Sequence, residues 1–367
     1  MKAVAFIGLA WFIFSCSPKQ DQVNFSELED WFSKEYPENE PGGALLIAKG
    51  DSILYSGAWG LADLNTQEKV STRTLFNLGS ISKTFVANAV LQLRNEGKLS
   101  LEDSLIKYFP DFKNRSIGEK VKIKHLLTHT SGLPDIRFPY RDSVFYLTAK
   151  DKENWAPILK ADSLNFEPGS SFEYSNPAFN ALALIVEQVS GVKWQAYIEE
   201  KILRPSKMFS STITDGAHPQ SGVAHGYIYS LGKWLEKDYM EEPTFAASGN
   251  GGVWSNVEEL LNYELAIRNE IFLDSGTLSE SRTIQKFKNW NRVMPEFIGW
   301  SWFITQSQSG LTQIGHTGSQ GGFRGNYVFI PEKDWLIVIL SGAPRDLERQ
   351  AAHAIEFLEN QNSHSSL

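Results

Sequence analysis

The chain has 367 residues, of which 42% are hydrophobic and 21% are charged, and its formal net charge is −8. This length and composition allow a substantial buried core, formed by one large or two interlocked globular units. The 11 Trp and 23 Phe residues argue against a disordered chain, because disorder goes with few aromatic residues. No block of Lys or Arg is present, so the chain lacks the basic surface that nucleic-acid binding requires.

The N-terminus has the pattern of an export signal. A short basic start precedes an apolar run at residues 3–14, which is too short to span a bilayer. Cys16, the only cysteine, follows this run, and residues 13–16 resemble a bacterial lipobox, in which the cysteine is lipidated. We therefore predict a lipoprotein signal peptide at 1–15, a polar tether at 16–30 and an exported protein that is lipid-anchored on the periplasmic or cell-surface side of a bacterial membrane. An ordinary cleaved signal and a buried free thiol are the alternatives.

Strand and helix patterns then follow in chain order. Apolar runs at 42–48 and 52–56 are separated by Lys49-Gly50-Asp51 and predict a hairpin. Helical spacing at 82–97 and 177–189 ends at Gly97 and Gly191, respectively. Further strands are predicted at 299–306, 311–316, 325–331 and 335–341, before a closing helix at 346–360.

Strands at both ends with helices between them predict an α/β (α+β) fold, with one sheet built from both termini and a helical lobe inserted in the middle. We place the folded domain at 31–360, with the α/β lobe at about 31–80 and 225–360 and the helical lobe at about 81–224. Ligand sites favour clefts between such lobes.

The candidate nucleophile is Ser80, in the pattern Ser80-Ile81-Ser82-Lys83. Positions i and i+3 of a helix share a face, so the Lys83 amine can reach the Ser80 hydroxyl. A serine hydroxyl needs a neighbouring base, and a lysine serves as one when burial or positive potential lowers its pKa. The helix N-terminus also directs the Ser80 backbone N–H towards a carbonyl oxygen, as half of an oxyanion hole.

The Ser-x-x-Lys pattern alone is weak evidence, because the chain contains it four times. Ser104/Lys107 lies in a polar, acidic stretch, Ser190/Lys193 is at a helix end, and Ser230/Lys233 is in a turn. Only Ser80 follows a glycine at a strand-to-helix junction and opens a long apolar helix.

Two further motifs complete a set: Tyr174-Ser175-Asn176 before a helix, and His316-Thr317-Gly318 at the end of a predicted strand. In this order, with Ser80-x-x-Lys83, they resemble the penicillin-recognising serine hydrolases, which include class C β-lactamases, DD-carboxypeptidases, esterases and D-aminopeptidases. The likeness runs from about residue 42 to 341. It implies a β-lactamase/transpeptidase-like fold, whose sheet is antiparallel and flanked by helices.

The resemblance also implies roles. Ser80 would form an acyl-enzyme, Lys83 would act as or assist the base, and Tyr174 would shuttle the proton, which needs a lowered pKa. Asn176 would bind Lys83 or a substrate amide. His316, Thr317 and Gly318 would line the opposite side of the cleft, where the Ser319 N–H would be the second oxyanion donor.

The residue at position 316 limits the range of substrates that we expect. Related β-lactamases usually carry Lys where His316 stands, and a neutral histidine pairs weakly with a carboxylate near pH 7. We therefore favour an ester or a D-Ala-D-Ala-type peptide over a β-lactam. Arg324 could bind a carboxylate bidentately, or it could be a solvated loop charge.

A metal site is not favoured. His125 and His129 have i, i+4 spacing, but the zinc protease motif needs Glu where Leu126 stands, so a capping or core role is expected. We predict a monomeric serine hydrolase that needs no metal or organic cofactor, with β-lactamase activity as the alternative. A non-catalytic peptidoglycan-fragment or penicillin binder is the rival from another class, although it would not need all three of Ser80, Lys83 and Tyr174.

Overall fold

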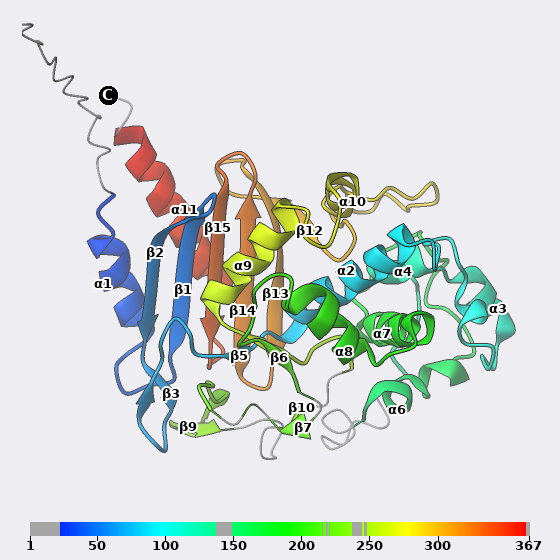
Figure 1. Cartoon of the computed structure of the whole chain (residues 1–367), viewed down its shortest axis with the longest axis horizontal. Helices are drawn as coiled ribbons and strands as arrows, with labels where there is room; N and C mark the ends of the chain where they lie inside the picture. Colours follow the sequence, from blue (N-terminus) through cyan, green and yellow to red (C-terminus); the bar gives the residue numbers. More distant parts are fainter. Residues whose placement is uncertain are drawn as a thin grey trace, which may run out of the picture.

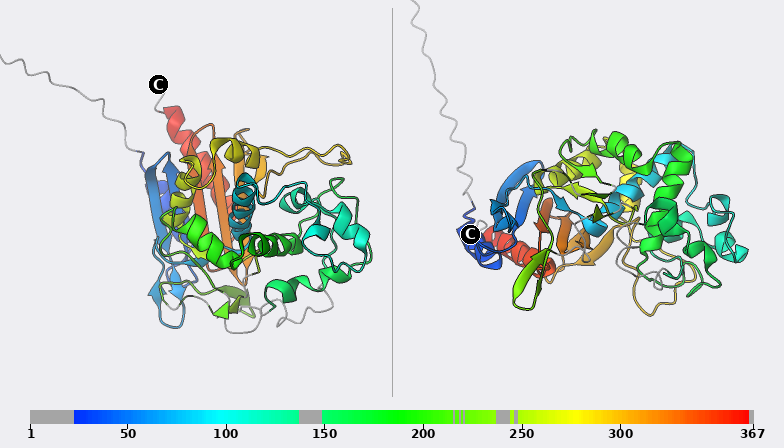
Figure 2. Two further views of the ribbon diagram at one scale, coloured as in Figure 1. Left: turned by 45° about the vertical axis from the view of Figure 1, so that its right-hand side comes forward. Right: turned by 90° about the horizontal axis from the view of Figure 1, so that it is seen from below.

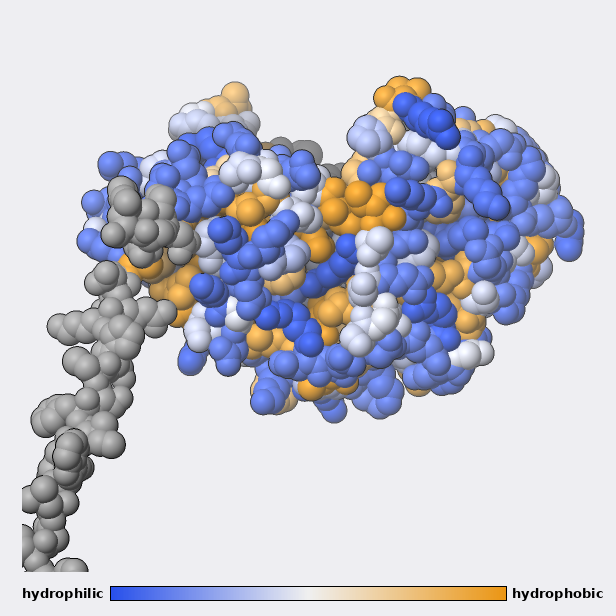
Figure 3. Space-filling view, turned by 90° about the horizontal axis from the view of Figure 1, so that it is seen from above, coloured by the Kyte–Doolittle hydropathy of each residue, from blue (hydrophilic) through white to orange (hydrophobic). Residues whose placement is uncertain are grey.

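The computed structural model describes residues 23–136, 149–214, 216–217, 219, 221–236, 244–245 and 248–364. The predicted signal peptide and Cys16 lie outside these ranges. Within them, no helix is both long and apolar enough to cross a membrane. The face shown in Figure 3 is largely hydrophilic, with small hydrophobic patches between polar side chains.

A six-stranded antiparallel sheet, in the order β12-β13-β14-β15-β1-β2, forms the centre of the molecule (Figure 1). Two strands come from the N-terminal part of the chain and four from the C-terminal part, which confirms the predicted sheet built from both termini. The strands are β1 (Gly43–Lys49), β2 (Ser52–Trp59), β12 (Phe303–Gln306), β13 (Thr312–Gln320), β14 (Phe323–Ile330) and β15 (Trp335–Ser341).

Helices cover both faces of this sheet (Figures 1 and 2). On one face, α1 (Ser26–Glu35) and α11 (Leu347–His364) pack on Leu45 and Ile47 of β1 and on Ile337 and Ile339 of β15. The alternate residues of the same strands join the larger core on the other face, with α2 (Ser82–Asn95) and α9 (Val257–Arg268). Strands buried on both faces need continuous apolar runs, which is the pattern of β1 and β15.

The larger core continues from the sheet into the helical part of the chain. There, α2 packs against α7 (Asn176–Ser190), which ends at Gly191 with a left-handed φ of +79°. The remaining helices are α3 (Arg115–Lys120), α4 (Ile123–Leu127), α6 (Asp151–Trp155), α8 (Trp194–Ile198) and α10 (Ser275–Ser281), with 3₁₀ turns η1 (Gly79–Ile81), η2 (Leu105–Lys107) and η4 (Ile158–Lys160) and the π-helical turn η5 (Glu199–Leu203).

Short strands complete the fold. They are β3 (Leu61–Asp63), β4 (Glu68–Lys69), β5 (Phe76–Asn77), β6 (Thr212–Ile213), β7 (Gly216–Ala217), β8 (Tyr227–Ser230), β9 (Lys233–Glu236), β10 (Thr244–Phe245) and β11 (Val253–Ser255). The pairing β5-β11-β6 is the one that matters for the site, because β5 leads directly into the turn that carries Ser80.

Several strand boundaries differ from the sequence prediction: β2 extends to Trp59, β14 spans Phe323–Ile330, and two further differences lie near the site. The strand predicted at 299–306 begins only at Phe303, because the N–H of Trp300 donates to the Ser281 carbonyl and that of Ser301 to the Leu127 carbonyl, and Ser301 has a φ of +70°. The strand predicted at 311–316 extends to Gln320. The His316 motif therefore lies within β13 and not at its end.

At the N-terminal end, α1 begins at Ser26, within the stretch 16–30 that was assigned to the tether. Leu28 and Phe32 of this helix are fully buried against the sheet. The packed part of the chain therefore begins about one helical turn earlier than the predicted boundary at residue 31.

Candidate active site

Ser80 lies in a tight turn between β5 and α2. The Asn77 side chain accepts a hydrogen bond from the Gly79 N–H at 2.8 Å, and Gly79 has a φ of +50°, which favours glycine. The 3₁₀ turn η1 then carries Ser80 directly into α2. The predicted strand-to-helix junction is thus present, with Ser80 in the 3₁₀ turn that precedes the α-helix.

Lys83 lies one turn later, and its side chain is fully buried. Its Nζ donates to Ser80 Oγ at 2.9 Å and to the backbone carbonyl oxygen of Asn250 at 2.9 Å. Nζ also lies 5.0 Å from the centre of the Tyr174 ring and 5.8 Å from that of Phe179. The lysine is therefore held against the serine hydroxyl in an environment of aromatic rings.

The other three Ser-x-x-Lys pairs lie elsewhere. Lys107 Nζ binds the Asp103 carboxylate at 2.7 Å, and Lys193 binds Asp151 and Glu187 at the end of α7. Ser230 and Lys233 face each other across the turn between β8 and β9. The local context that singled out Ser80 in the sequence is reproduced in the structure.

Gly318 and Ser319 of β13 lie directly against the Ser80 turn. A Cβ atom at Gly318 would be 2.0 Å from the Leu78 carbonyl oxygen and 3.4 Å from Ser80 N, and one at Gly79 would be 2.6 Å from Ser319 N. Only glycine fits such close contacts between backbones. The amides of Ser80 and Ser319, the two expected oxyanion donors, are therefore brought side by side.

Tyr174 completes the group around the nucleophile. Its residue is 39% exposed, while its hydroxyl lies beside the Ser80 side chain. Loss of solvent around the hydroxyl raises the pKa of Tyr174, and the Ser80 side chain opposes this only in part. The expectation of a lowered pKa was therefore wrong, because desolvation of the phenolate dominates. Tyr174 is a neutral phenol at neutral pH.

Asn176 and Arg324 flank this group. Asn176 is the first residue of α7, after Ser175, whose side chain caps the helix by accepting from Ala178 N. Its contact with Lys83 stays a prediction. Arg324, opposite Ser319 in the β13–β14 ladder, donates from Nη1 to Ser319 Oγ at 2.5 Å and to the Phe323 carbonyl at 3.0 Å. Its guanidinium therefore lies next to the predicted oxyanion strand.

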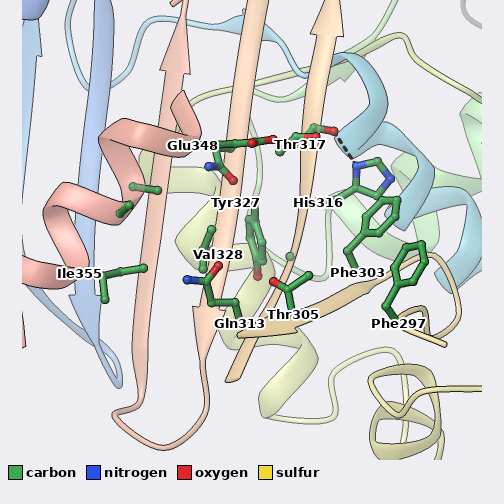
Figure 4. Close-up of a pocket in the computed structure, with 14 residues that line it drawn as sticks. Phe297, Phe303, Thr305, Gln313, His316, Thr317, Tyr327, Val328, Glu348 and Ile355 are labelled. Carbon is green, nitrogen blue, oxygen red and sulfur yellow. Dashed lines mark hydrogen bonds between the residues drawn. The ribbon is translucent and has the colours of Figure 1, made fainter. Parts of the chain in front are cut away.

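His316 is buried, with 3% of its surface exposed. Its Nδ1 donates to the Thr317 carbonyl oxygen at 2.6 Å (Figure 4), while Nε2 is buried without a hydrogen-bond partner among the described residues. Burial, reinforced by the positive charge of Lys83, lowers the pKa of His316 to about 3. The imidazole is therefore neutral at pH 7, as expected from sequence, and supplies no cation for a substrate carboxylate.

A cavity of about 420 Å³ begins at His316 and Thr317 and extends between the sheet and α11 (Figure 4). It neighbours the nucleophile but does not contain it. Its lining is Phe297, Phe303, Thr305, Gln313, Gly315, His316, Thr317, Asn326, Tyr327, Val328, Glu348, Ala351, Ala352 and Ile355.

Sequence reasoning missed two residues of the site. The sequence motifs do not single out Asn250, yet its carbonyl oxygen accepts a hydrogen bond from Lys83. His129 was assigned a capping or core role, yet its ring stacks on Tyr174 with centroids 4.3 Å apart. His125 does cap, since its Nδ1 accepts from the Lys122 N–H at the start of α4. Within the described ranges, no three His, Cys, Asp or Glu residues are grouped as metal ligands would be.

Comparison with known proteins identifies the family of this chain. A model of the β-lactamase family matches residues 32–359. Penicillin-binding protein 4* of Bacillus subtilis (strain 168) is 26% identical over 340 residues, covering 89% of this chain and 73% of that protein. A putative D-alanyl-D-alanine carboxypeptidase of Escherichia coli (strain K12) is 28% identical over 376 residues, covering 89% of this chain and 85% of the relative.

The solved structure of the octameric penicillin-binding protein homologue from Pyrococcus abyssi has the same fold, with a TM-score of 0.78 at 26% identity, covering 91% of this chain and 77% of that one. Its agreement with the central sheet and helical lobe confirms the predicted β-lactamase/transpeptidase-like architecture. Since the family match spans most of the chain, this protein belongs to the β-lactamase family and is a serine hydrolase related to penicillin-binding proteins and DD-carboxypeptidases.

Proposed function

We propose that this protein hydrolyses an ester or a D-Ala-D-Ala-type peptide through an acyl-enzyme on Ser80. The observation that carries this proposal is the 2.9 Å contact between Lys83 Nζ and Ser80 Oγ, with the Tyr174 hydroxyl beside the same serine. A nucleophile within hydrogen-bond reach of a base is the signature of covalent catalysis.

The proposed chemistry follows from these contacts. Ser80 Oγ attacks the substrate carbonyl carbon, and its proton passes to Lys83 in its neutral form, directly or through Tyr174. The negative oxygen that develops would be bound by the amides of Ser80 and Ser319. When the intermediate collapses, the bond to the leaving oxygen or nitrogen breaks, and Tyr174 as a neutral phenol donates its proton to the leaving group and takes one back from the Lys83 ammonium. Water then attacks the acyl carbonyl carbon as its proton passes to the neutral Lys83. The Ser80 oxygen leaves and takes up this proton, which releases the acid and restores Ser80.

The substrate preference rests on His316. A neutral, buried imidazole offers a substrate an acceptor at Nε2, whereas a lysine would offer a permanent charge to a carboxylate. This disfavours β-lactams, which remain the alternative substrate. A peptide ending in D-Ala would need another group for its carboxylate, and Arg324 beside Ser319 is the candidate. The name of the E. coli relative, a putative D-alanyl-D-alanine carboxypeptidase, supports the peptide.

A three-substrate panel tests the proposal. Purified protein is incubated with a p-nitrophenyl ester, an N-acyl-D-Ala-D-Ala peptide and a chromogenic cephalosporin, with Ser80→Ala in parallel. We expect turnover of the ester or the peptide by wild type and none by Ser80→Ala. Preferred turnover of the cephalosporin would establish the alternative, and ester hydrolysis that survives in Ser80→Ala would refute the nucleophile.

We further propose that the protein is exported and held at a bacterial membrane by a lipid on Cys16, and that it acts as a monomer. The apolar run before Cys16 supports the anchor. Cell fractionation of wild type and Cys16→Ala tests it, with release of the variant from the membrane as the expected result. A variant that stays membrane-bound would contradict the anchor. Sedimentation of the detergent-solubilised protein measures the oligomeric state.

A further inference from the structure

We propose that His129 is a positioning residue for catalysis. It keeps the Tyr174 phenol next to Ser80 by hydrogen-bonding the backbone on both sides of the tyrosine and by supporting its ring. This inference rests on the proposed role of Tyr174. Nothing in the sequence motifs assigns His129, which comes 45 residues before the tyrosine, and the residue touches neither Ser80 nor Lys83 in the contacts described above.

Two hydrogen bonds connect His129 to the neighbours of Tyr174. The N–H of Glu173 donates to the His129 carbonyl oxygen at 3.0 Å, and the N–H of Ser175 donates to His129 Nδ1 at 3.0 Å. Both neighbours of Tyr174 are thus hydrogen-bonded to His129, one to its main chain and the other to its side chain. This fixes the backbone from which the phenol projects.

The imidazole also supports the phenol ring itself. His129 stacks on Tyr174 with an interplanar angle of 26°, and Phe179 and Phe172 contact the same imidazole with centroids at 5.1 and 5.8 Å. Phe303 lies 6.4 Å from the Tyr174 ring and 6.5 Å from the imidazole, nearly parallel to both. The imidazole therefore supports the phenol as part of an aromatic cluster beside Ser80.

The local conformation of His129 is uncommon for a residue other than glycine. Its φ is +55°, in the left-handed region, and its side chain is completely buried. Nδ1 accepts a hydrogen bond, so in the neutral ring Nε2 carries the hydrogen, and Nε2 has no hydrogen-bond partner within the part of the chain that the structure describes. A strained backbone and an unsatisfied buried donor both cost stability, which is typical of residues retained for a function.

The neutral ring is required for this role, because a protonated Nδ1 could not accept from Ser175. Burial, reinforced by the positive charge of Lys83, keeps the pKa of His129 well below its usual value. The acceptor is therefore available throughout the range in which Lys83 and Tyr174 would work.

Two substitutions separate the hydrogen bond from the stack. In His129→Asn, the amide oxygen can still accept from Ser175, and asparagine tolerates a left-handed φ, but the ring is lost. In His129→Phe, the ring remains while the Ser175 N–H loses its acceptor. Since small displacements of catalytic groups cost up to about 100-fold, we expect kcat to fall about 10- to 100-fold in His129→Phe and less in His129→Asn, with KM nearly unchanged.

The chain provides a matched control in His125, four residues earlier. It is also buried, and its Nδ1 also accepts a backbone N–H, that of Lys122, but it caps α4 away from Ser80. We expect His125→Asn to lose thermal stability while its kcat stays within about twofold of wild type, below the 10- to 100-fold expected from a displaced catalytic group.

A double-mutant cycle with Tyr174→Phe decides whether His129 acts through the tyrosine. The readouts are kcat on the ester and the rate at which a fluorophosphonate labels Ser80. If His129 positions Tyr174, the His129 substitutions cost little further in the Tyr174→Phe background. Equal losses in both backgrounds, or His129 variants that keep wild-type kcat while Tyr174→Phe is slow, would overturn the inference. A Tyr174→Phe variant as fast as wild type would instead remove the proposed role of Tyr174.

Discussion

Two polar clusters lie on the same face of the central sheet, on neighbouring strands. His316 of β13 and Tyr327 of β14 are opposite each other in the antiparallel ladder, so their side chains point to the same side. His316 lies near the candidate catalytic group of Ser80, Lys83 and Tyr174, and its ring centre is 6.4 Å from that of Tyr174. Tyr327 instead donates to the carboxylate of Glu264 on α9.

The two clusters bind a buried basic side chain in different ways. Arg282 donates to both oxygens of Glu264, at 2.8 and 2.6 Å, with side-chain exposures of 7% and 0%, and stacks 4.7 Å from the Trp302 ring. Lys83 donates to a serine hydroxyl and a backbone carbonyl, both neutral oxygens. A carboxylate holds a cation in place, whereas a hydroxyl next to an amine can exchange a proton with it. The Arg282–Glu264 arrangement therefore fixes the structure, whereas the Lys83–Ser80 arrangement allows proton transfer.

The substitution Lys83→Met is the strongest test of this difference between the two clusters. Methionine has a similar length but cannot accept the Ser80 proton, so we expect kcat to fall by about 10³-fold or more, by analogy with removal of a triad base. The urea midpoint should change little, because the lysine is not part of the ion-paired cluster. Equilibrium urea unfolding and ester turnover measure the two effects. A variant that unfolds readily but keeps its turnover number would reverse the assignment of roles.

Glu264→Gln should have the opposite effect, with lower stability and an unchanged turnover number. It leaves the Arg282 guanidinium buried without its carboxylate, and breaking such a pair costs about 3–5 kcal/mol of stability. The turnover number per folded molecule should be retained, since Glu264 does not contact Ser80, Lys83 or Tyr174 in the interactions described here. Urea unfolding followed by circular dichroism, with active-site titration, measures both. The double substitution Glu264→Leu/Arg282→Met serves as the control and should recover part of the loss.

The sequence predicted the local contact of the candidate catalytic cluster well and its long-range contacts poorly. Ser80 and Lys83 are one helical turn apart, so their contact follows from local geometry. The contacts of Lys83 with Asn250 and of His129 with Ser175 join residues 167 and 46 positions apart, and no local periodicity encodes such distances. Likewise, the alternating Trp300 and Trp302 resemble a strand, but distant carbonyls take the backbone N–H groups there. The raised pKa of Tyr174 depends on desolvation, which a sequence does not display.

Gly318→Ala tests the backbone contact between β13 and the Ser80 turn. Its Cβ would be 2.0 Å from the Leu78 carbonyl oxygen, so the strand must move away and the amides of Ser80 and Ser319 must separate. Loss of one oxyanion donor costs about 10²–10³ in kcat, and we expect the lower end of this range. Gly276→Ala, in α10, is the control, since its nearest neighbour there is the Asp274 side chain at 3.1 Å. Wild-type kcat in Gly318→Ala would show that the oxyanion site is elsewhere.

The pH dependence of stability tests the buried histidines, of which His129 and His316 lie beside the candidate catalytic group. Burial lowers the pKa of His316 to about 3 and that of His125 to about 4, and keeps that of His129 well below its usual value. The unfolded chain binds these protons near pH 6.5 and the native protein does not, so the stability present above pH 6.5 is lost as the pH falls. Each histidine contributes up to about 1.4 kcal/mol per pH unit.

His225 has the opposite sign, because its hydrogen bond with Glu236 raises its pKa. Its contribution is complete below pH 6.5 and is lost only as the pH rises through its raised pKa, so it does not offset the other three between pH 6.5 and 5. Arg282 keeps its charge there, because the charge of Glu264 outweighs burial and raises its pKa further. Urea midpoints at pH 7, 6 and 5 should therefore decline, and His125→Asn should reduce the slope by one proton. A flat profile over this range would mean that the native state can protonate these histidines, and that the catalytic side of the sheet is more open to water than the ion pair beside it.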